Sequence, residues 1–210
     1  MTVTPDLLLQ AYRAGVFPMA EHRDDPEVFW VDPRKRGVFP LDGFRISRSL
    51  AKTLKRDAYR VTLNTAFGDV IDSCADRSET WINHEIRTLY EELHYKGHAH
   101  SIEVWMQDRL VGGVYGVSLG GGFFGESMFS HRRDTSKIAL AYLMDRLRQT
   151  GFKLCDTQFL TPHLASLGAI EISRAAYKAR LQQALEYDAD FDAPQLPSPT
   201  LLLQRMTQTS

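Results

Sequence analysis

The sequence has few cysteines and no long apolar segment, and these shortages exclude several classes of protein. It contains 2 cysteines, Cys74 and Cys155, which are too few and too scattered for a disulfide framework or a zinc site. No apolar run approaches the roughly 20 residues that span a bilayer, and the chain does not open with a signal peptide. The 210 residues also lack internal repeats, and their net charge is only −1. We therefore expect a globular cytoplasmic protein with a full core and no membrane partner.

The small net charge hides a strongly basic segment. Nine basic residues and two acidic ones lie between residues 33 and 60, so this segment carries +7 and the rest of the chain −8. Residues 47–56 have the periodicity of an amphipathic helix with a basic outer face. A solvated helix face alone explains such a pattern, but the basic residues at 34–36 favour a local surface for a polyanion such as RNA. The candidate contacts are Arg34, Lys35, Arg36, Arg48, Lys52 and Lys55.

The order of the expected elements is that of a mixed α+β fold. Helical periodicity predicts helices over residues 5–14, 47–56, 66–75, 81–95, 135–148 and 173–187. Strand patterns cover residues 59–63, 101–105, 110–119, 123–130 and 153–159, and residues 101–130 read as an antiparallel meander. The proline-punctuated residues 17–40 suggest a small N-terminal lobe, and residues 201–204 suggest an edge strand. This order resembles N-acetyltransferase-type folds, in which helices flank a mixed sheet.

Two of the expected strands carry polar side chains that can converge. A glycine-rich turn at residues 120–122 leads into a strand that carries Glu126 among apolar residues. The strand at residues 153–159 carries Asp156 and Gln158, which point to one face because side chains alternate along a strand. If the two strands are neighbours, the three groups meet in a pocket with apolar walls. Such a pocket suits a ligand that is partly cationic and partly apolar.

Two other groups of residues admit both a functional and a structural interpretation. The helix start near residue 135 follows Arg132 and Arg133, and it fits a phosphate seat and an ordinary capped helix equally well. Three histidines between residues 94 and 100 are interrupted by Gly97, and no cysteine or carboxylate completes a compact ligand set. We therefore favour packing roles for these histidines and expect no metal site.

Several ordered segments of the chain resemble the leucyl/phenylalanyl-tRNA–protein transferase family. The resemblance runs from about residue 8 to residue 181, which is far more specific than one short motif. Its segments are Ala-Tyr-Arg-Ala-Gly-Val-Phe-Pro at 11–18, Ile-Ser-Arg-Ser-Leu at 46–50, Thr-Trp-Ile at 80–82, Gly-His-Ala-His-Ser-Ile-Glu-Val-Trp at 97–105, Leu-Val-Gly-Gly-Val-Tyr-Gly-Val at 110–117, Phe-Gly-Glu-Ser-Met-Phe-Ser at 124–130, Ser-Lys at 136–137 and His-Leu-Ala-Ser-Leu-Gly-Ala at 163–169.

The resemblance implies an activity, a domain organisation and a set of partners. Family members transfer Leu or Phe, and also Met, from aminoacyl-tRNA to the α-amino group of proteins that begin with Lys or Arg, which marks the acceptor for N-degron degradation. It implies a small N-terminal lobe, here residues 1–42, and a catalytic domain similar to the N-acetyltransferase fold, here residues 43–210. It also implies a monomer without a cofactor. Family members commonly have a longer N-terminus than this short form.

The resemblance also implies roles for individual residues. Asp156 and Gln158 are the strongest catalytic candidates: Gln158 would offer its carbonyl oxygen to the attacking amine, while Asp156 orients Gln158 and attracts the cationic end of the acceptor. Glu126 would help to position the attacking amine or the α-ammonium group of the donor. The remaining donor contacts would be Val114, Phe123, Met128 and Leu147 around the aminoacyl side chain, Trp30 and Trp81 beside the adenosine, and Ser130 as a hydrogen-bonding group. The basic helix, with Arg132 and Arg133, would grip the tRNA.

Two other functions remain compatible with parts of the sequence. An acyl-CoA-dependent N-acyltransferase agrees with the expected fold, although the Gly-x-Gly pattern of coenzyme A binders is missing after residue 130. A non-catalytic RNA-binding module agrees with the basic segment. Binding of coenzyme A would identify the first, and an Asp156→Ala variant with unchanged function would favour the second.

Overall fold

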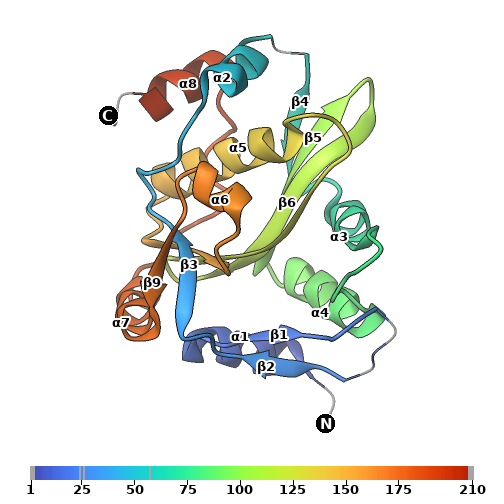
Figure 1. Cartoon of the computed structure of the whole chain (residues 1–210), viewed down its shortest axis with the longest axis vertical. Coiled ribbons are helices and arrows are strands. Elements are labelled where there is room, and N and C mark those ends of the chain that lie inside the picture. The colour runs from blue at the N-terminus through green and yellow to red at the C-terminus, as the bar shows by residue number, and fades with distance from the viewer. Residues whose placement is uncertain (1–2, 24, 26, 57, 208–210) are drawn as a thin grey trace.

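A seven-stranded mixed sheet organises the computed structural model, which describes residues 3–23, 25, 27–56 and 58–207 (Figure 1). The strands are β3 (Lys35–Phe39), β4 (Arg60–Leu63), β5 (Ala99–Met106), β6 (Arg109–Leu119), β7 (Gly122–Ser130), β8 (Leu154–Gln158) and β9 (Ile170–Ser173). Their order is β4-β5-β6-β7-β8-β3-β9, and every neighbouring pair is antiparallel except β7 and β8. The predicted meander is β5-β6-β7.

Helices cover both faces of this sheet, and each face has its own apolar core (Figure 1). One core contains side chains of α2 (Arg48–Lys55), α5 (Thr135–Gln149) and α8 (Pro199–Thr207), with the short α6 (Pro162–Ser166) packed against it. The other contains side chains of α1 (Pro5–Ala14), α3 (Phe67–Ala75), α4 (His84–Tyr95) and α7 (Arg174–Leu185). The expected α+β architecture, a mixed sheet flanked by helices, is confirmed. No helix in these residues is long and apolar enough to cross a membrane.

Strands β7 and β8 separate soon after they begin, and this separation creates space for a site. Their parallel pairing covers only Gly122 to Phe124 on β7 and Leu154 to Asp156 on β8. Beyond it, β7 has a register shift against β6: Gly125 pairs with Gly116 and Ser127 with Tyr115, so Glu126 between them is the extra residue of a β-bulge. Bulges bend a strand and redirect a side chain, and they are frequent beside active sites.

The N-terminal segment contributes to both a small lobe and the large sheet. Residues before β3 form α1 and a two-stranded sheet of β1 (Phe17–Met19) and β2 (Phe29–Val31). The next strand, β3, lies between β8 and β9, so these residues belong to the large sheet rather than to the lobe in which the sequence analysis placed them. Its position fixes the lobe against the strand that carries Asp156 and Gln158.

Local sequence signals located the helices well, with one error. Helix α1 begins after the Thr4 cap with Pro5 in its first turn and ends at Gly15, whose φ of 81° is left-handed, as predicted. The edge strand predicted at residues 201–204 is wrong, because these residues lie in α8. A short run of leucines fits either element by pattern alone. Pro199 at the first position of this segment favours the helix.

Candidate active site

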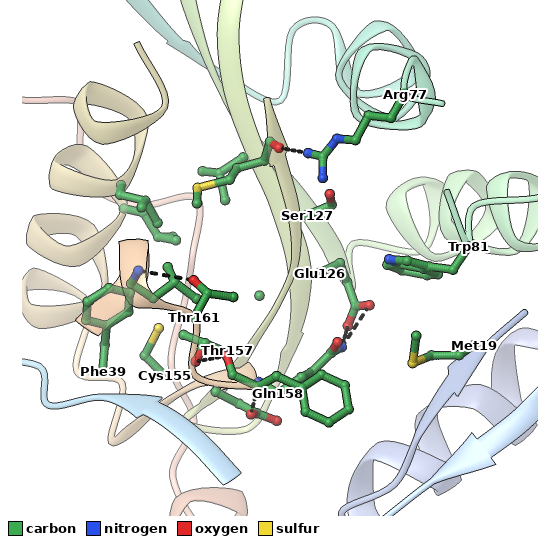
Figure 2. Close-up of a pocket in the computed structure, with 18 residues that line it drawn as sticks. Met19, Phe39, Arg77, Trp81, Glu126, Ser127, Cys155, Thr157, Gln158 and Thr161 are labelled. Carbon is green, nitrogen blue, oxygen red and sulfur yellow. Dashed lines mark hydrogen bonds between the residues drawn. The ribbon is translucent and has the colours of Figure 1, made fainter. Parts of the chain in front are cut away.

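A pocket of about 290 Å³ lies where β7 and β8 separate (Figure 2). Glu126 and Gln158 lie together at its polar end, with Trp81 and Met19 to one side and Phe39 to the other. The rest of the lining is mainly apolar. The volume is close to the lower end of the range for small-molecule sites, and a few polar groups among apolar walls are typical of such sites.

Glu126 and Gln158 are in direct contact. The Gln158 amide Nε2 donates to both carboxylate oxygens of Glu126 at 3.1 Å. This contact turns the amide nitrogen toward the carboxylate and leaves Oε1 of Gln158 without a hydrogen-bond donor among the described residues. The pocket therefore contains a side-chain carbonyl oxygen that is held in place and free to accept an N–H group from a ligand.

Two tyrosines from different helices fix the Glu126 carboxylate. Tyr12 on α1 donates to Oε1 at 2.6 Å, and Tyr90 on α4 donates to Oε2 at 2.8 Å. Burial raises the pKa of both phenols, so they remain protonated donors at neutral pH. Burial also raises the pKa of Glu126 to about 7, although its three hydrogen-bond donors oppose the shift. Glu126 therefore titrates near neutral pH, which is unusual for a carboxyl group.

Asp156 lies behind Gln158 and is fully engaged by the protein. Its carboxylate accepts from Arg36 Nε at 2.9 Å and Arg36 Nη2 at 2.6 Å, and from the Tyr177 hydroxyl at 2.7 Å. It also accepts the backbone N–H of Gln158 at 2.8 Å, at a residue with a positive φ of 62°. The contact supports the predicted orienting role. The predicted attraction of a cationic acceptor is wrong in this geometry, because Arg36 neutralises the carboxylate and Asp156 is 0% exposed.

Arg36 was predicted to bind tRNA, and the structure contradicts this. Its side chain is 1% exposed and lies between the rings of Phe17 and Tyr177, with the guanidinium carbon 4.5 and 4.4 Å from the ring centroids. Nη1 donates to the Gly15 carbonyl at 3.0 Å. Arg36 therefore ties the end of α1 and the strand β1 to the Asp156 carboxylate.

The apolar walls of the pocket agree with the predicted lining in part. Val114 and Met128 line it, as expected. Phe123 does not: it is buried in the core, stacked on Phe191 at 5.2 Å. Leu147 is also fully buried outside the pocket, and α5 contributes Leu143 and Leu140 instead, which lie about one and about two turns earlier. Sequence spacing could not select the correct turn of this helix, since nearly all of it is apolar or buried.

Of the three residues predicted to contact the adenosine or the donor, one lines the pocket and two do not. Trp81 lines the pocket, whereas Trp30 lies on β2, is 40% exposed and is not part of the lining. Ser130 is not part of it either, because its hydroxyl donates to the Arg132 carbonyl at 2.8 Å and accepts the Ser136 N–H at 3.3 Å. Ser130 therefore caps the start of α5. The sequence alone was compatible with either a capped helix or a phosphate-binding site at this position.

The other basic residues predicted to bind tRNA are exposed. Arg48, Lys52 and Lys55 on α2, together with Arg56, line a shallow hollow of about 490 Å³, and no ion pair to them occurs within the described part of the chain. Arg34, Arg132 and Arg133 are exposed as well, and Lys35 forms a surface ion pair with Glu171 at 3.1 Å. The outer face of α2 is thus the densest unpaired positive charge that these residues present.

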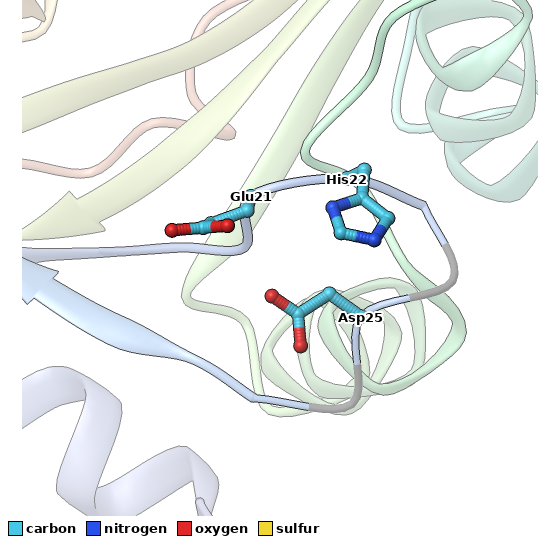
Figure 3. A group of neighbouring side chains, drawn as sticks. All are labelled: Glu21, His22 and Asp25. Atoms are coloured by element: carbon cyan, nitrogen blue, oxygen red, sulfur yellow. The ribbon is translucent and has the colours of Figure 1, made fainter.

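His94 and His100 have packing and hydrogen-bonding roles. His94 stacks on Phe67 with ring centroids 4.3 Å apart, and buried His100 hydrogen-bonds to the Asn64 and Ser118 side chains. Within the described residues, one group offers metal-type ligand atoms within 4.8 Å of one another: Glu21, His22 and Asp25 (Figure 3). Glu21 and His22 are exposed and Asp25 is half-buried, and nothing else there points to a ligand.

Comparison with known proteins places the chain in a family. The sequence model of the leucyl/phenylalanyl-tRNA protein transferase family matches residues 38–182, and the model of its N-terminal domain matches residues 1–34. Two relatives named leucyl/phenylalanyl-tRNA--protein transferase, from Ruegeria sp. (strain TM1040) and Ruegeria pomeroyi, are 70% and 62% identical over 100% of both chains. The structure of FemX matches with a TM-score of 0.52 and 11% identity over 80% of this chain and 66% of that one, which concerns the fold alone. By sequence, the chain belongs to the leucyl/phenylalanyl-tRNA protein transferase family.

Proposed function

We propose that this protein is an aminoacyltransferase that moves Leu or Phe, and also Met, from aminoacyl-tRNA to the α-amino group of an acceptor protein. The observation that carries the proposal is the free Oε1 of Gln158, fixed by Glu126 at one end of an apolar pocket. The apolar end has room for one aminoacyl side chain, and the polar end can hold an amine.

The reaction needs positioning more than it needs chemical activation. The donor is an ester of the tRNA 3′-terminal ribose, which is already reactive toward amines. The neutral α-amine of the acceptor attacks the ester carbonyl, a new C–N bond forms, the C–O bond to the ribose breaks, and the amine proton passes to the ribose oxygen. Gln158 accepts an N–H of the attacking amine, which directs the nitrogen lone pair at the carbonyl. Holding two reactants in such geometry supplies much of the rate by itself.

Glu126 and Asp156 support Gln158 from two sides. Glu126 holds the side-chain amide, and Asp156 holds the backbone N–H of the same residue. Glu126 also gives the polar end of the pocket a negative charge that grows as the pH rises through neutrality, because its pKa is about 7. That charge favours the α-ammonium group of the donor amino acid nearby.

Donor choice follows from the apolar lining. Val114, Met128, Leu140 and Leu143 offer contact area and no hydrogen-bonding side chain. Apolar pockets discriminate one methylene group by only about 1–3 kcal/mol. Tolerance of Leu, Phe and Met is therefore the expected behaviour.

The partners follow from charge and from the family. We assign the tRNA body to the exposed face of α2, with Arg34, Lys35, Arg132 and Arg133 as further contacts. Acceptors begin with Lys or Arg and are thereby marked for N-degron degradation, and the enzyme acts as a monomer in the cytoplasm, where charged tRNA is available. The lobe and the sheet domain act as one unit, since Tyr12 of the lobe donates to Glu126 and Arg36 of β3 donates to both the Gly15 carbonyl and Asp156.

A direct transfer assay tests the proposal. Radiolabelled Leu-tRNA or Phe-tRNA is incubated with a peptide that has N-terminal Arg, and label in the peptide is measured for wild type and Gln158→Ala. Wild type should transfer label, and the variant should lose at least about 100-fold in kcat, since orientation effects of this kind are large. Arg109→Ala, at the exposed first residue of β6, is the control. Absence of transfer by wild type, with transfer from acyl-CoA instead, would establish the rival acyltransferase.

A further inference from the structure

Arg77 is a cation of the pocket that the catalytic groups do not use. It is the one basic residue among the described residues that line the pocket. Its Nη2 donates to the Met128 carbonyl, and the other guanidinium N–H groups have no acceptor within the described chain. No ion pair joins Arg77 to a carboxylate among the described residues, and its one side-chain hydrogen bond goes to a backbone carbonyl. Arginine has five N–H donors in a planar fork, so most of its capacity to bind an anion is open.

Arg77 reaches the pocket beside β7, at a distance from Gln158. Figure 2 shows its side chain reaching toward β7 beside Ser127, at the end of the pocket opposite Gln158. It contacts β7 at Met128, two residues beyond Glu126, which corresponds to about 7 Å along a strand. An anion bound by Arg77 would therefore be separated from the reacting groups by about the length of one ribose.

The segment that carries Arg77 is itself held in place. Arg23 donates from the small lobe to the carbonyls of Ala75 and Arg77, at 2.5 and 3.2 Å. Trp81 lies four residues later in the same connection between α3 and α4 and also lines the pocket. One short, anchored segment therefore presents a guanidinium and an indole ring to the same space. Nucleotides are commonly bound by this pair, through stacking on the base and a charge-assisted bond to the phosphate.

We propose that Arg77 binds the phosphodiester that precedes the 3′-terminal adenosine of the donor, and so sets how far the aminoacyl ester enters the pocket. The inference rests on the proposed function, because it assumes an aminoacyl-tRNA donor. In that donor the phosphate is separated from the ester oxygen by one ribose, which agrees with the spacing between Arg77 and Glu126 along β7. Glu126 and Asp156 are the acidic groups of the pocket, and both already have donors from the protein.

Two synthetic donors that differ only in this phosphate test the inference. One is 3′-phenylalanyl-adenosine with a methyl phosphodiester on its 5′ oxygen, and the other is 3′-phenylalanyl-adenosine without the phosphate. Transfer to a peptide with N-terminal Arg is measured as kcat/KM for wild type, Arg77→Ala, Arg77→Lys and the control Arg180→Ala, which changes an exposed residue of α7.

The comparison between donors makes the test independent of folding defects. We expect Arg77→Ala to lower kcat/KM about 10- to 100-fold for the phosphodiester donor, the size expected for a hydrogen bond to a charged group. The same protein should use the phosphate-free donor as well as wild type does. Arg77→Lys should retain part of the preference, and Arg180→Ala all of it. Equal losses on both donors would overturn the inference, whereas a wild type that uses neither donor, nor Phe-tRNA, would refute the proposed function instead.

Discussion

The buried pair of Arg36 and Asp156 predicts an unusually large loss of stability when its cation is removed. The two side chains are 1% and 0% exposed, and their closest N–O distance is 2.6 Å. Arg36→Met keeps an unbranched stem between the rings of Phe17 and Tyr177 but removes the charge and every donor. Asp156 then remains buried with only the Tyr177 hydroxyl and the Gln158 N–H as partners.

The expected magnitude follows from the cost of an uncompensated buried charge. Removing one partner of a buried ion pair costs about 3–5 kcal/mol, whereas replacing both partners by neutral groups is often close to neutral. A domain has only about 5–15 kcal/mol of total stability, so Arg36→Met should remove a large part of it. The double variant Arg36→Met/Asp156→Asn should recover about 2 kcal/mol or more, because the orphaned charge is gone.

Urea unfolding at pH 7 of wild type, both single variants and the double variant measures these free energies. Arg87→Met is the matched control: Arg87 also pairs with an aspartate at 2.6 Å, but the side chains of Arg87 and Asp72 are 31% and 55% exposed. Such exposed pairs contribute at most about 1 kcal/mol. If Arg36→Met costs no more than Arg87→Met, or if the double variant is no more stable than Arg36→Met, the pair is not a buried charge pair in solution and the reasoning fails.

Three further outcomes are expected. Burial raises the pKa of Glu126 from 4.5 to about 7, so the unfolded chain loses this proton first and stability falls as pH rises between these values, by up to about 3 kcal/mol. Glu126→Gln should abolish this contribution, which is measured as the difference between the free energies of unfolding in urea at pH 4.5 and pH 7.5. If the variant keeps the same difference as wild type, the prediction is contradicted. Val114→Phe narrows the donor pocket and should raise the Leu-to-Phe ratio of kcat/KM about tenfold in a competition assay, whereas an unchanged ratio would place the donor side chain elsewhere. Gly37→Ala puts a Cβ 2.6 Å from Thr157 Oγ1, so it should lower the transfer activity and also lower the free energy of unfolding in urea by more than about 1 kcal/mol. A loss of neither would show that β3 can shift freely against β8.

The sequence predicted the parts of the fold that depend on neighbours in the chain. The Thr4 cap, Pro5 and Gly15 define α1 to the residue, because capping and left-handed turns are local. The strands β3 and β9 were not predicted, because each is short and pairs with a distant segment. The prediction of a strand at residues 201–204 is wrong because a short run of leucines fits a helix and a strand equally well, and these residues lie in α8.

The same division applies to the candidate site. The three polar groups Glu126, Asp156 and Gln158 could be named in advance, because strand alternation and the glycine-rich turn are visible in the sequence. Their partners could not. Tyr12 and Arg36 come from the N-terminal segment, and only the packed structure shows that they end at Glu126 and Asp156. The bulge that aims Glu126 depends on the register between β6 and β7, which the sequence does not display.

The place of β3 in the sheet has a consequence for how the enzyme is made. Arg36 meets Asp156 across 120 positions of sequence, and the last strand of the sheet, β9, ends only at Ser173. During synthesis β3 emerges early and must remain without its two neighbours until most of the chain has been translated. Pairings of such long range form late and slowly, because closing the intervening loop costs entropy before the contacts can offset it. The candidate site is thus among the last parts to assemble, because Arg36 can meet Asp156 only after β8 has been translated.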